Sequence, residues 1–124
     1  MQTILIVDDS GFQRKFLQKA LQDGGFQTLE AANGEEALAV AAAERPDAIL
    51  TDLIMPDMRG LALLEILRER GSEIPIVVLT ADIQEPVEAE CLELGAARVL
   101  HKPIKPAALT DALTEVLSLG AATP

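Results

Sequence analysis

Three aspartates stand directly after two short runs of apolar residues. Asp8 and Asp9 follow the run at residues 3–7, and Asp52 follows the run at residues 48–51. If the fold brings them together, the three carboxylates repel one another and raise each other's pKa values unless a cation lies among them. Each aspartate alone is also typical of a helix N-cap, so only the combination indicates a cation site.

Two further polar residues end later apolar runs. Thr80 closes the run at residues 76–80, and Lys102 follows the run at residues 98–101. A cation, a lysine and a hydroxyl around a central carboxylate are suited to handling a phosphoryl group. In that arrangement Asp52 would be the nucleophile and form an acyl phosphate. Lys102 and the metal would neutralise charge on the transferred group, and Thr80 would donate a hydrogen bond to it.

The residue types favour a hard cation. The chain has one histidine and one cysteine, and Cys91 falls on the apolar stripe of a predicted helix, which argues against zinc. Mg²⁺ (or Mn²⁺) binds one or two carboxylates together with waters and phosphate oxygens. We therefore expect a site of the magnesium type.

The chain is short and strongly acidic. Its 124 residues are predicted to form one domain, 1–124, with a frayed tail at residues 120–124. Twenty acidic against ten basic residues give a net charge of −10, which argues against nucleic acid and anionic membranes as partners. A single cysteine, no apolar run of membrane-spanning length and no secretion signal favour a cytoplasmic protein.

Strand-length apolar runs alternate with segments of helical spacing. Strands, each followed by a helix, are predicted over residues 3–7, 26–31, 48–51, 76–80 and 98–101. Five such units predict an α/β fold with a doubly wound parallel sheet covered by helices on both faces. The carboxyl ends of parallel strands share one edge, and ligands bind there at the point where the strand order reverses.

The two phenylalanines of the first predicted helix are interpreted as structural. Phe12 and Phe16 recur at helical spacing with Ala20 and Leu21. We therefore expect both rings to pack in the core rather than to bind a partner.

Six short motifs fall in order along the predicted elements. They are Ile6-Val7-Asp8-Asp9-Ser10, Ala32-Asn33-Gly34-Glu35-Glu36-Ala37-Leu38, Asp52-Leu53-Ile54-Met55-Pro56 with Gly60, Leu79-Thr80-Ala81, Gly95-Ala96 and His101-Lys102-Pro103. Each motif alone is weak, but together they are specific. From Ile4 to Leu117 the chain resembles the CheY-like receiver domain of two-component response regulators. The resemblance implies a flavodoxin-like fold, with five strands in the order 2-1-3-4-5 and five helices.

The resemblance also implies a ligand set for the cation. Asp9 and Asp52 would bind Mg²⁺ directly, together with the backbone carbonyl of Ile54. Asp8 would act mainly through a water molecule.

A phosphorelay role follows from the same resemblance. Asp52 would accept a phosphoryl group from a sensor histidine kinase or a histidine phosphotransfer protein, and Thr80 and Lys102 would hold it. The Lys102–Pro103 bond is expected to be cis. Phosphorylation would draw Thr80 inward and change the face made by the fourth helix, fifth strand and fifth helix, which a downstream protein target would bind. The chain would then be a signalling protein that catalyses only its own phosphorylation and dephosphorylation.

Several positions depart from the family pattern. Val99 stands where the family often has an aromatic residue, so switching must run through Thr80 and the loop Ala81–Pro86. Ile54 and Asp82 occupy the positions at which the family tunes the lifetime of the acyl phosphate.

Three alternatives are weighed against this hypothesis. A flavodoxin-like cofactor binder needs a phosphate loop where this chain has Asp8-Asp9, and it needs aromatic side chains, whereas this chain has no Tyr or Trp. A phosphatase of the haloacid dehalogenase type carries Asp-x-Asp rather than adjacent aspartates. A pseudo-receiver, which is an interaction module without phosphorylation, remains an alternative because Val99 replaces the aromatic residue that the family often has at this position.

Overall fold

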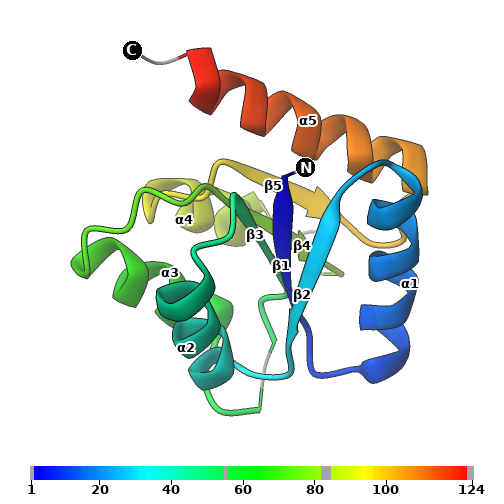
Figure 1. The fold of residues 1–124 in the computed structure, drawn as a ribbon. Helices are drawn as coiled ribbons and strands as arrows, with labels where there is room; N and C mark the ends of the chain where they lie inside the picture. Colours follow the sequence, from blue (N-terminus) through cyan, green and yellow to red (C-terminus); the bar gives the residue numbers. More distant parts are fainter. Residues whose placement is uncertain (1, 55, 82–84, 123–124) are drawn as a thin grey trace.

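Strands and helices alternate along the chain, as the sequence predicts (Figure 1). The structure, a computed structural model, describes residues 2–54, 56–81 and 85–122. Its elements are β1 (Thr3–Val7), α1 (Gly11–Asp23), β2 (Gln27–Ala31), α2 (Gly34–Glu44), β3 (Ala48–Thr51), α3 (Gly60–Glu69), β4 (Ile76–Thr80), α4 (Glu85–Glu93), β5 (Arg98–His101) and α5 (Pro106–Ala122).

The strands form one parallel sheet in the order β2-β1-β3-β4-β5, which confirms the predicted flavodoxin-like topology. The central strands β1, β3 and β4 are almost wholly buried, as a sheet covered on both faces requires. The register pairs Val7 with Thr51, so Asp8 and Asp52 leave neighbouring strands at the same level. Thr80 pairs with His101, which places Lys102 just beyond the end of β4.

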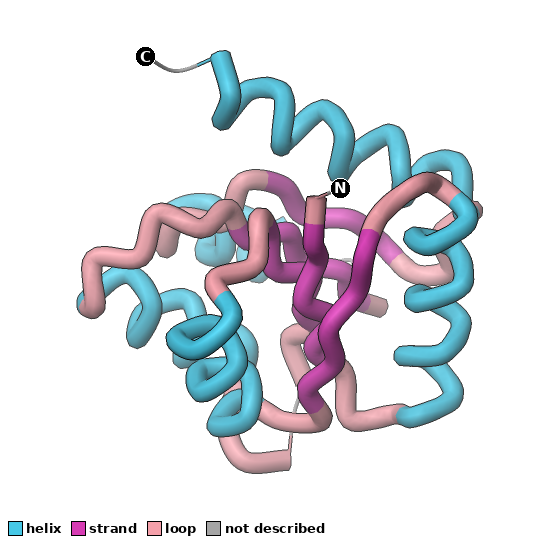
Figure 2. The backbone as a smooth tube through the Cα atoms, viewed as in Figure 1, coloured by secondary structure: helices cyan, strands magenta, loops and turns pink. Residues whose placement is uncertain are grey.

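Alternate residues of each strand serve two separate hydrophobic cores. Ile4 and Ile6 belong to the core beneath α1 and α5, whereas Leu5 and Val7 belong to the core beneath α2, α3 and α4. Figure 2 shows the same division, with α1 and α5 on one side of the sheet and α2 and α3 on the other. Cys91 lies fully buried in the second core, as its place on the apolar stripe predicts.

Side-chain caps start the two helices that follow β1 and β2. Ser10 Oγ accepts a hydrogen bond from the Gln13 backbone N–H at 3.2 Å, and Asn33 Oδ1 accepts one from the Glu36 N–H at 2.8 Å. Such caps satisfy amides that the first helical turn leaves unpaired. The β1–α1 connection, which carries Asp8 and Asp9, is therefore short and ordered by local bonds.

One expectation about the first helix needs correction. Phe12 and Phe16 are 85% and 42% exposed, so the prediction that they pack in the core is wrong. The core-facing stripe of α1 is made by Leu17, Ala20 and Leu21, and at 3.6 residues per turn Phe16 lies about 90° and Phe12 about 130° around the helix from the centre of this stripe. In addition, α5 continues through residues 120–122, part of the expected tail, while residues 123 and 124 lie outside the described residues.

Gly60 begins α3 where that helix touches the end of β3. A Cβ at this position would stand 2.7 Å from the Asp52 carbonyl oxygen and 2.7 Å from Leu53 Cα. We expect Gly60→Ala to lower the free energy of unfolding by about 1–3 kcal/mol, because backbone must move to admit the methyl group. Urea denaturation followed by circular dichroism measures it. The control is Gly11→Ala, whose Cβ would have its nearest neighbour at 3.6 Å; an equal loss there would contradict the steric explanation.

Candidate functional site

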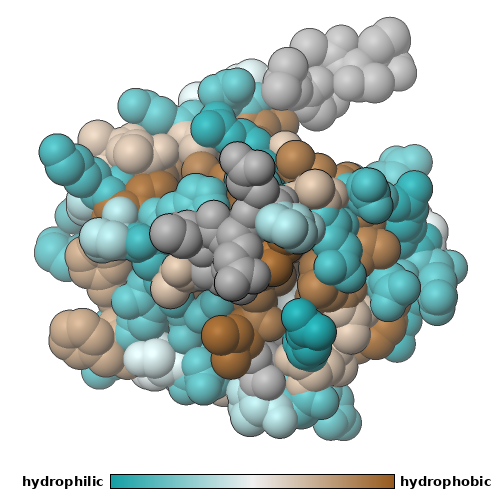
Figure 3. Space-filling view, turned by 180° about the vertical axis from the view of Figure 1, so that it is seen from behind, coloured by the Kyte–Doolittle hydropathy of each residue, from teal (hydrophilic) through white to brown (hydrophobic). Residues whose placement is uncertain are grey.

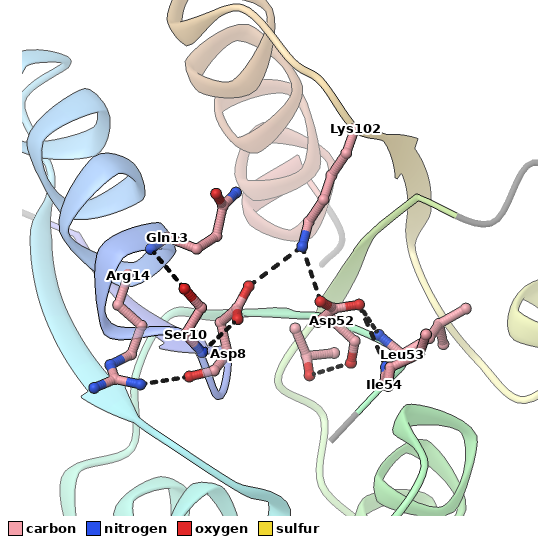
Figure 4. Close-up of polar contacts among 9 residues, drawn as sticks. Asp8, Ser10, Gln13, Arg14, Asp52, Leu53, Ile54 and Lys102 are labelled. Atoms are coloured by element: carbon pink, nitrogen blue, oxygen red, sulfur yellow. Dashed lines mark hydrogen bonds and ion pairs between the residues drawn. The ribbon is translucent and has the colours of Figure 1, made fainter. Parts of the chain in front are cut away.

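Two aspartates and a lysine from three strand ends meet in one cluster (Figure 4). Lys102 Nζ donates to Asp52 Oδ2 at 2.8 Å and to Asp8 Oδ2 at 3.3 Å. The Asp8 side chain is 3% exposed, that of Asp52 13% and that of Lys102 22%. Two largely buried carboxylates therefore share one ammonium group, and the cluster keeps an excess of negative charge.

Backbone amides hold the second oxygen of each carboxylate. Asp52 Oδ1 accepts from the N–H of Leu53 at 2.7 Å and from that of Ile54 at 3.3 Å. Asp8 Oδ1 accepts from the N–H of Ser10 at 2.9 Å. These amides belong to the turns that follow β1 and β3. The backbone of each turn therefore holds one oxygen of the carboxylate, and the other oxygen accepts from Lys102.

The charge state of Lys102 follows from its partners. Burial by itself would lower the pKa of Lys102, but the hydrogen bond and charge of Asp52, reinforced by Asp8, outweigh it and raise this pKa above the ordinary 10.5. The stabilisation from this pairing is therefore fully present below pH 10.5 and is lost as the pH rises through the raised value. At neutral pH the lysine is a full positive charge.

The expected gathering of three carboxylates is not found. Asp9 is exposed, and among residues 2–54, 56–81 and 85–122 no three His, Cys, Asp or Glu side chains stand close enough together to hold a metal ion. The structure brings Asp8 and Asp52 together through Lys102 instead. The donors still suit Mg²⁺, which needs only one or two carboxylates and completes its shell with waters and carbonyl oxygens such as that of Ile54.

Of the remaining predicted residues, Ala81 and Pro103 line a groove with Lys102. Thr80 is buried at the end of β4, and its carbonyl accepts from the Lys102 N–H at 2.8 Å. The Lys102–Pro103 peptide is cis, as the resemblance implied. Val99 packs against the core under α4, and Ala81 is exposed beside Thr80. Asp82 and Met55 lie outside the described residues.

Two residues near the site were missed by sequence reasoning. Arg14 Nη1 donates to the Asp8 carbonyl oxygen at 2.6 Å. Asp57 accepts from the N–H groups of Gly34 and Glu35, both at 2.9 Å, so the loop after Asp52 caps α2. These two amide bonds lower the pKa of Asp57. The Asp57 cap joins residues more than 20 positions apart, so no local sequence pattern predicts it.

Lys102→Met tests the central pairing. The substitution leaves two buried carboxylates facing each other, so we expect the free energy of unfolding at pH 7 to fall by about 2 kcal/mol. Removing one partner of a fully buried pair costs ~3–5 kcal/mol, and Lys102 is partly exposed. Millimolar Mg²⁺ should restore part of the loss in urea denaturation. Lys19→Met is the control, since its pair with Asp23 is exposed and contributes about 0.5 kcal/mol or less; equal losses would contradict the assignment.

Comparison with known proteins identifies the family. Residues 4–114 match the response regulator receiver domain family. The chain is 39% identical over 118 residues to the phosphate regulon transcriptional regulatory protein PhoB of Pseudomonas aeruginosa, covering 94% of this chain and 52% of that protein. It is 35% identical to the sporulation initiation phosphotransferase F of Bacillus subtilis, covering 95% of both chains.

A solved structure gives the same result. The Vibrio cholerae chemotaxis protein CheY4 superposes with a TM-score of 0.88 at 36% identity, covering 94% of this chain and 98% of that one. The chain spans about half the length of several curated relatives that it matches, the PhoB protein among them. With the cluster of Asp8, Asp52 and Lys102 at the sheet edge and a family match over most of its length, the chain belongs to the response regulator receiver family.

Proposed function

We propose that this chain is a phosphoacceptor receiver, in which Asp52 takes a phosphoryl group from a phosphohistidine in a Mg²⁺-dependent reaction. The observation that carries the proposal is the pairing of Lys102 with Asp8 and Asp52. An ion pair with a purely structural role would need one carboxylate for one lysine. Here two buried carboxylates share one lysine, so one negative charge is not neutralised. An excess of carboxylate oxygen beside a lysine is the combination that a cation and a phosphoryl group require.

The side chains divide the reaction between them. A carboxylate oxygen of Asp52 attacks phosphorus, the bond between phosphorus and the donor imidazole nitrogen breaks, and the electron pair stays on that nitrogen. The Lys102 ammonium, 2.8 Å from Asp52 Oδ2, faces the negative charge of the transferred group. The Thr80 hydroxyl would donate to a phosphoryl oxygen after the switch. When bound, Mg²⁺ would supply further positive charge and would be held by Asp9, Asp52 and the Ile54 carbonyl, with Asp8 acting through water.

The output would be a signal rather than a metabolic product. Hydrolysis of the acyl phosphate by water would reset the domain, with Ile54 and Asp82 as the positions that tune its lifetime. The face of α4, β5 and α5 would carry the signal to a downstream protein. His101 Nε2 on β5 lies 3.7 Å from Glu88 Oε2 on α4, so the two elements are neighbours on this face. The described residues include no helix that could cross a membrane.

A second surface, beside the phosphoacceptor, suits the donor protein. Phe12 and Phe16 line a groove with Pro103 and Ile104 that reaches Lys102. All four lysines of the chain, at 15, 19, 102 and 105, fall on α1 and the β5–α5 loop, although the chain carries a net charge of −10. In Figure 3, seen from behind, apolar side chains lie among polar ones along the left margin, where α1 runs. An apolar surface fringed by acidic side chains on the donor would complement it.

Intact mass measurement tests the phosphoacceptor directly. The chain is incubated with Mg²⁺ and acetyl phosphate, because without Trp or Tyr it gives little fluorescence or ultraviolet signal. We expect one added phosphoryl group on the native chain, none after chelation and none on Asp52→Asn. Asp57→Asn, an aspartate on the same loop, is the matched control and should still be phosphorylated.

The opposite result has a definite meaning. If the folded native chain gains no mass, a phosphorylated histidine kinase or phosphotransfer protein is tried as donor. Failure with both kinds of donor would leave a pseudo-receiver that binds a partner without phosphorylation. Equal phosphorylation of Asp52→Asn would move the acceptor to another residue.

Phe12→Ala tests the docking surface. Phosphotransfer from a histidine-phosphorylated protein donor should slow about tenfold, the size expected when an apolar anchor worth about 1.4 kcal/mol is lost. Phosphorylation by acetyl phosphate should be unchanged, since that donor needs no docking. Leu92→Ala removes another exposed apolar side chain, on α4, and should leave both rates unaltered. A similar slowing in Leu92→Ala would place the donor elsewhere.

A further inference from the structure

Arg14 reaches from α1 back to the strand end that carries Asp8 and Asp9 (Figure 4). Its Nη1 donates to the Asp8 carbonyl oxygen at 2.6 Å, and its Nε donates to Glu30 Oε1 on β2 at 3.2 Å. The side chain is only 20% exposed. Arg14 therefore braces the β1–α1 connection against the neighbouring strand.

The bonded carbonyl controls the direction of the next residue. The Asp8 carbonyl and the Asp9 N–H belong to one planar peptide unit, so holding one fixes the other. On its other side, the Asp8 N–H donates to the Ala31 carbonyl at 3.1 Å. Asp8 lies one residue beyond the last paired residue of β1, so its N–H continues the strand ladder whereas its carbonyl lies beyond the ladder. The bond from Arg14 constrains that carbonyl.

We propose that Arg14 is a positioning residue for divalent cation binding. By fixing the peptide between Asp8 and Asp9, it sets the direction in which the exposed Asp9 side chain leaves the end of β1, without touching the cation. The inference rests on the proposed function, because it needs the cation for which that function calls. Outer residues that orient metal ligands typically change metal affinity by about 10- to 100-fold when removed.

Charge alone predicts the opposite effect, so the sign of the change is decisive. A guanidinium near the site repels Mg²⁺, and its removal would strengthen binding if Arg14 acted only through its charge. Positioning predicts weaker binding instead. Glu30 offsets the charge of Arg14, so removing both partners leaves the net charge unaltered while the bond to the Asp8 carbonyl is lost.

Mg²⁺ titration by isothermal calorimetry, on the full chain and without any phosphodonor, separates the two effects. We expect Arg14→Met, and Arg14→Met combined with Glu30→Gln, to raise the Kd for Mg²⁺ about tenfold. Glu30→Gln alone keeps the bond from Arg14 to the Asp8 carbonyl and should stay within about twofold. Arg14→Lys can still donate to that carbonyl and should fall between the native chain and Arg14→Met.

Each other outcome counts against the proposal. An unchanged or lower Kd in Arg14→Met overturns it, and so does an equal loss in Glu30→Gln, which would make the ion pair rather than the carbonyl bond responsible. Thermal unfolding shows whether each variant is folded. If Arg14→Met is not folded, the Kd for Mg²⁺ of Arg14→Lys is compared with that of Glu30→Gln instead. A Kd for Arg14→Lys that is no higher than the Kd for Glu30→Gln then overturns the proposal. If the native chain binds no Mg²⁺, the proposed function and this inference fall together. If the native chain binds Mg²⁺ and Arg14→Met binds it equally well, only this inference falls.

Discussion

One ammonium group shared by two buried carboxylates is the constraint on which the rest of the site depends. Lys102 comes from the end of β5, Asp8 from β1 and Asp52 from β3, so the contact exists only if three strands end at one level. The parallel order β2-β1-β3-β4-β5 provides that level. Neither carboxylate could lie so deep without the lysine, because an unpaired buried charge is costly. The two buried carboxylates therefore require the strand arrangement that brings the lysine to them, and that arrangement positions all three side chains.

The backbone does most of the positioning. The Asp52 N–H donates to the Val7 carbonyl at 3.0 Å, and the Lys102 N–H donates to the Thr80 carbonyl at 2.8 Å, so each functional residue continues the strand ladder by one step. The close approach of Gly60 to the Asp52 carbonyl then fixes the turn beyond β3. Main-chain hydrogen bonds between the apolar strands thus determine where the side chains of the site lie. A small domain can therefore hold charged groups in nearly fixed positions.

The sequence predicts the parts that depend on local pattern. Apolar runs of strand length predict the buried strands. Polar residues end or follow four of the five predicted runs, and Asp8, Asp52 and Lys102 are among them. Phe12 and Phe16 could not be placed, because helical spacing gives a stripe but not which flank of it meets the sheet. The bond from Arg14 to the Asp8 carbonyl and the bonds from the Gly34 and Glu35 amides to Asp57 each involve a backbone atom, so residue type does not predict them. Asp9 is exposed and Asp8 is buried, although both are aspartates that follow the same apolar run, so residue type does not distinguish them.

The charge balance explains why such a site would require a cation. Asp8, Asp9 and Asp52 outnumber Lys102 by two negative charges, and a phosphoryl group would replace one carboxylate charge with about two. Lys102 now satisfies both Asp8 and Asp52. An ammonium group has three N–H donors, so the lysine could face a phosphoryl group on Asp52 while still donating to Asp8. The added negative charge would then stand close to the buried Asp8 carboxylate, with one ammonium group between them, and the site would need a second positive partner. A divalent cation beside Asp8 would meet that need, so phosphoryl transfer and cation binding would be linked through this cluster.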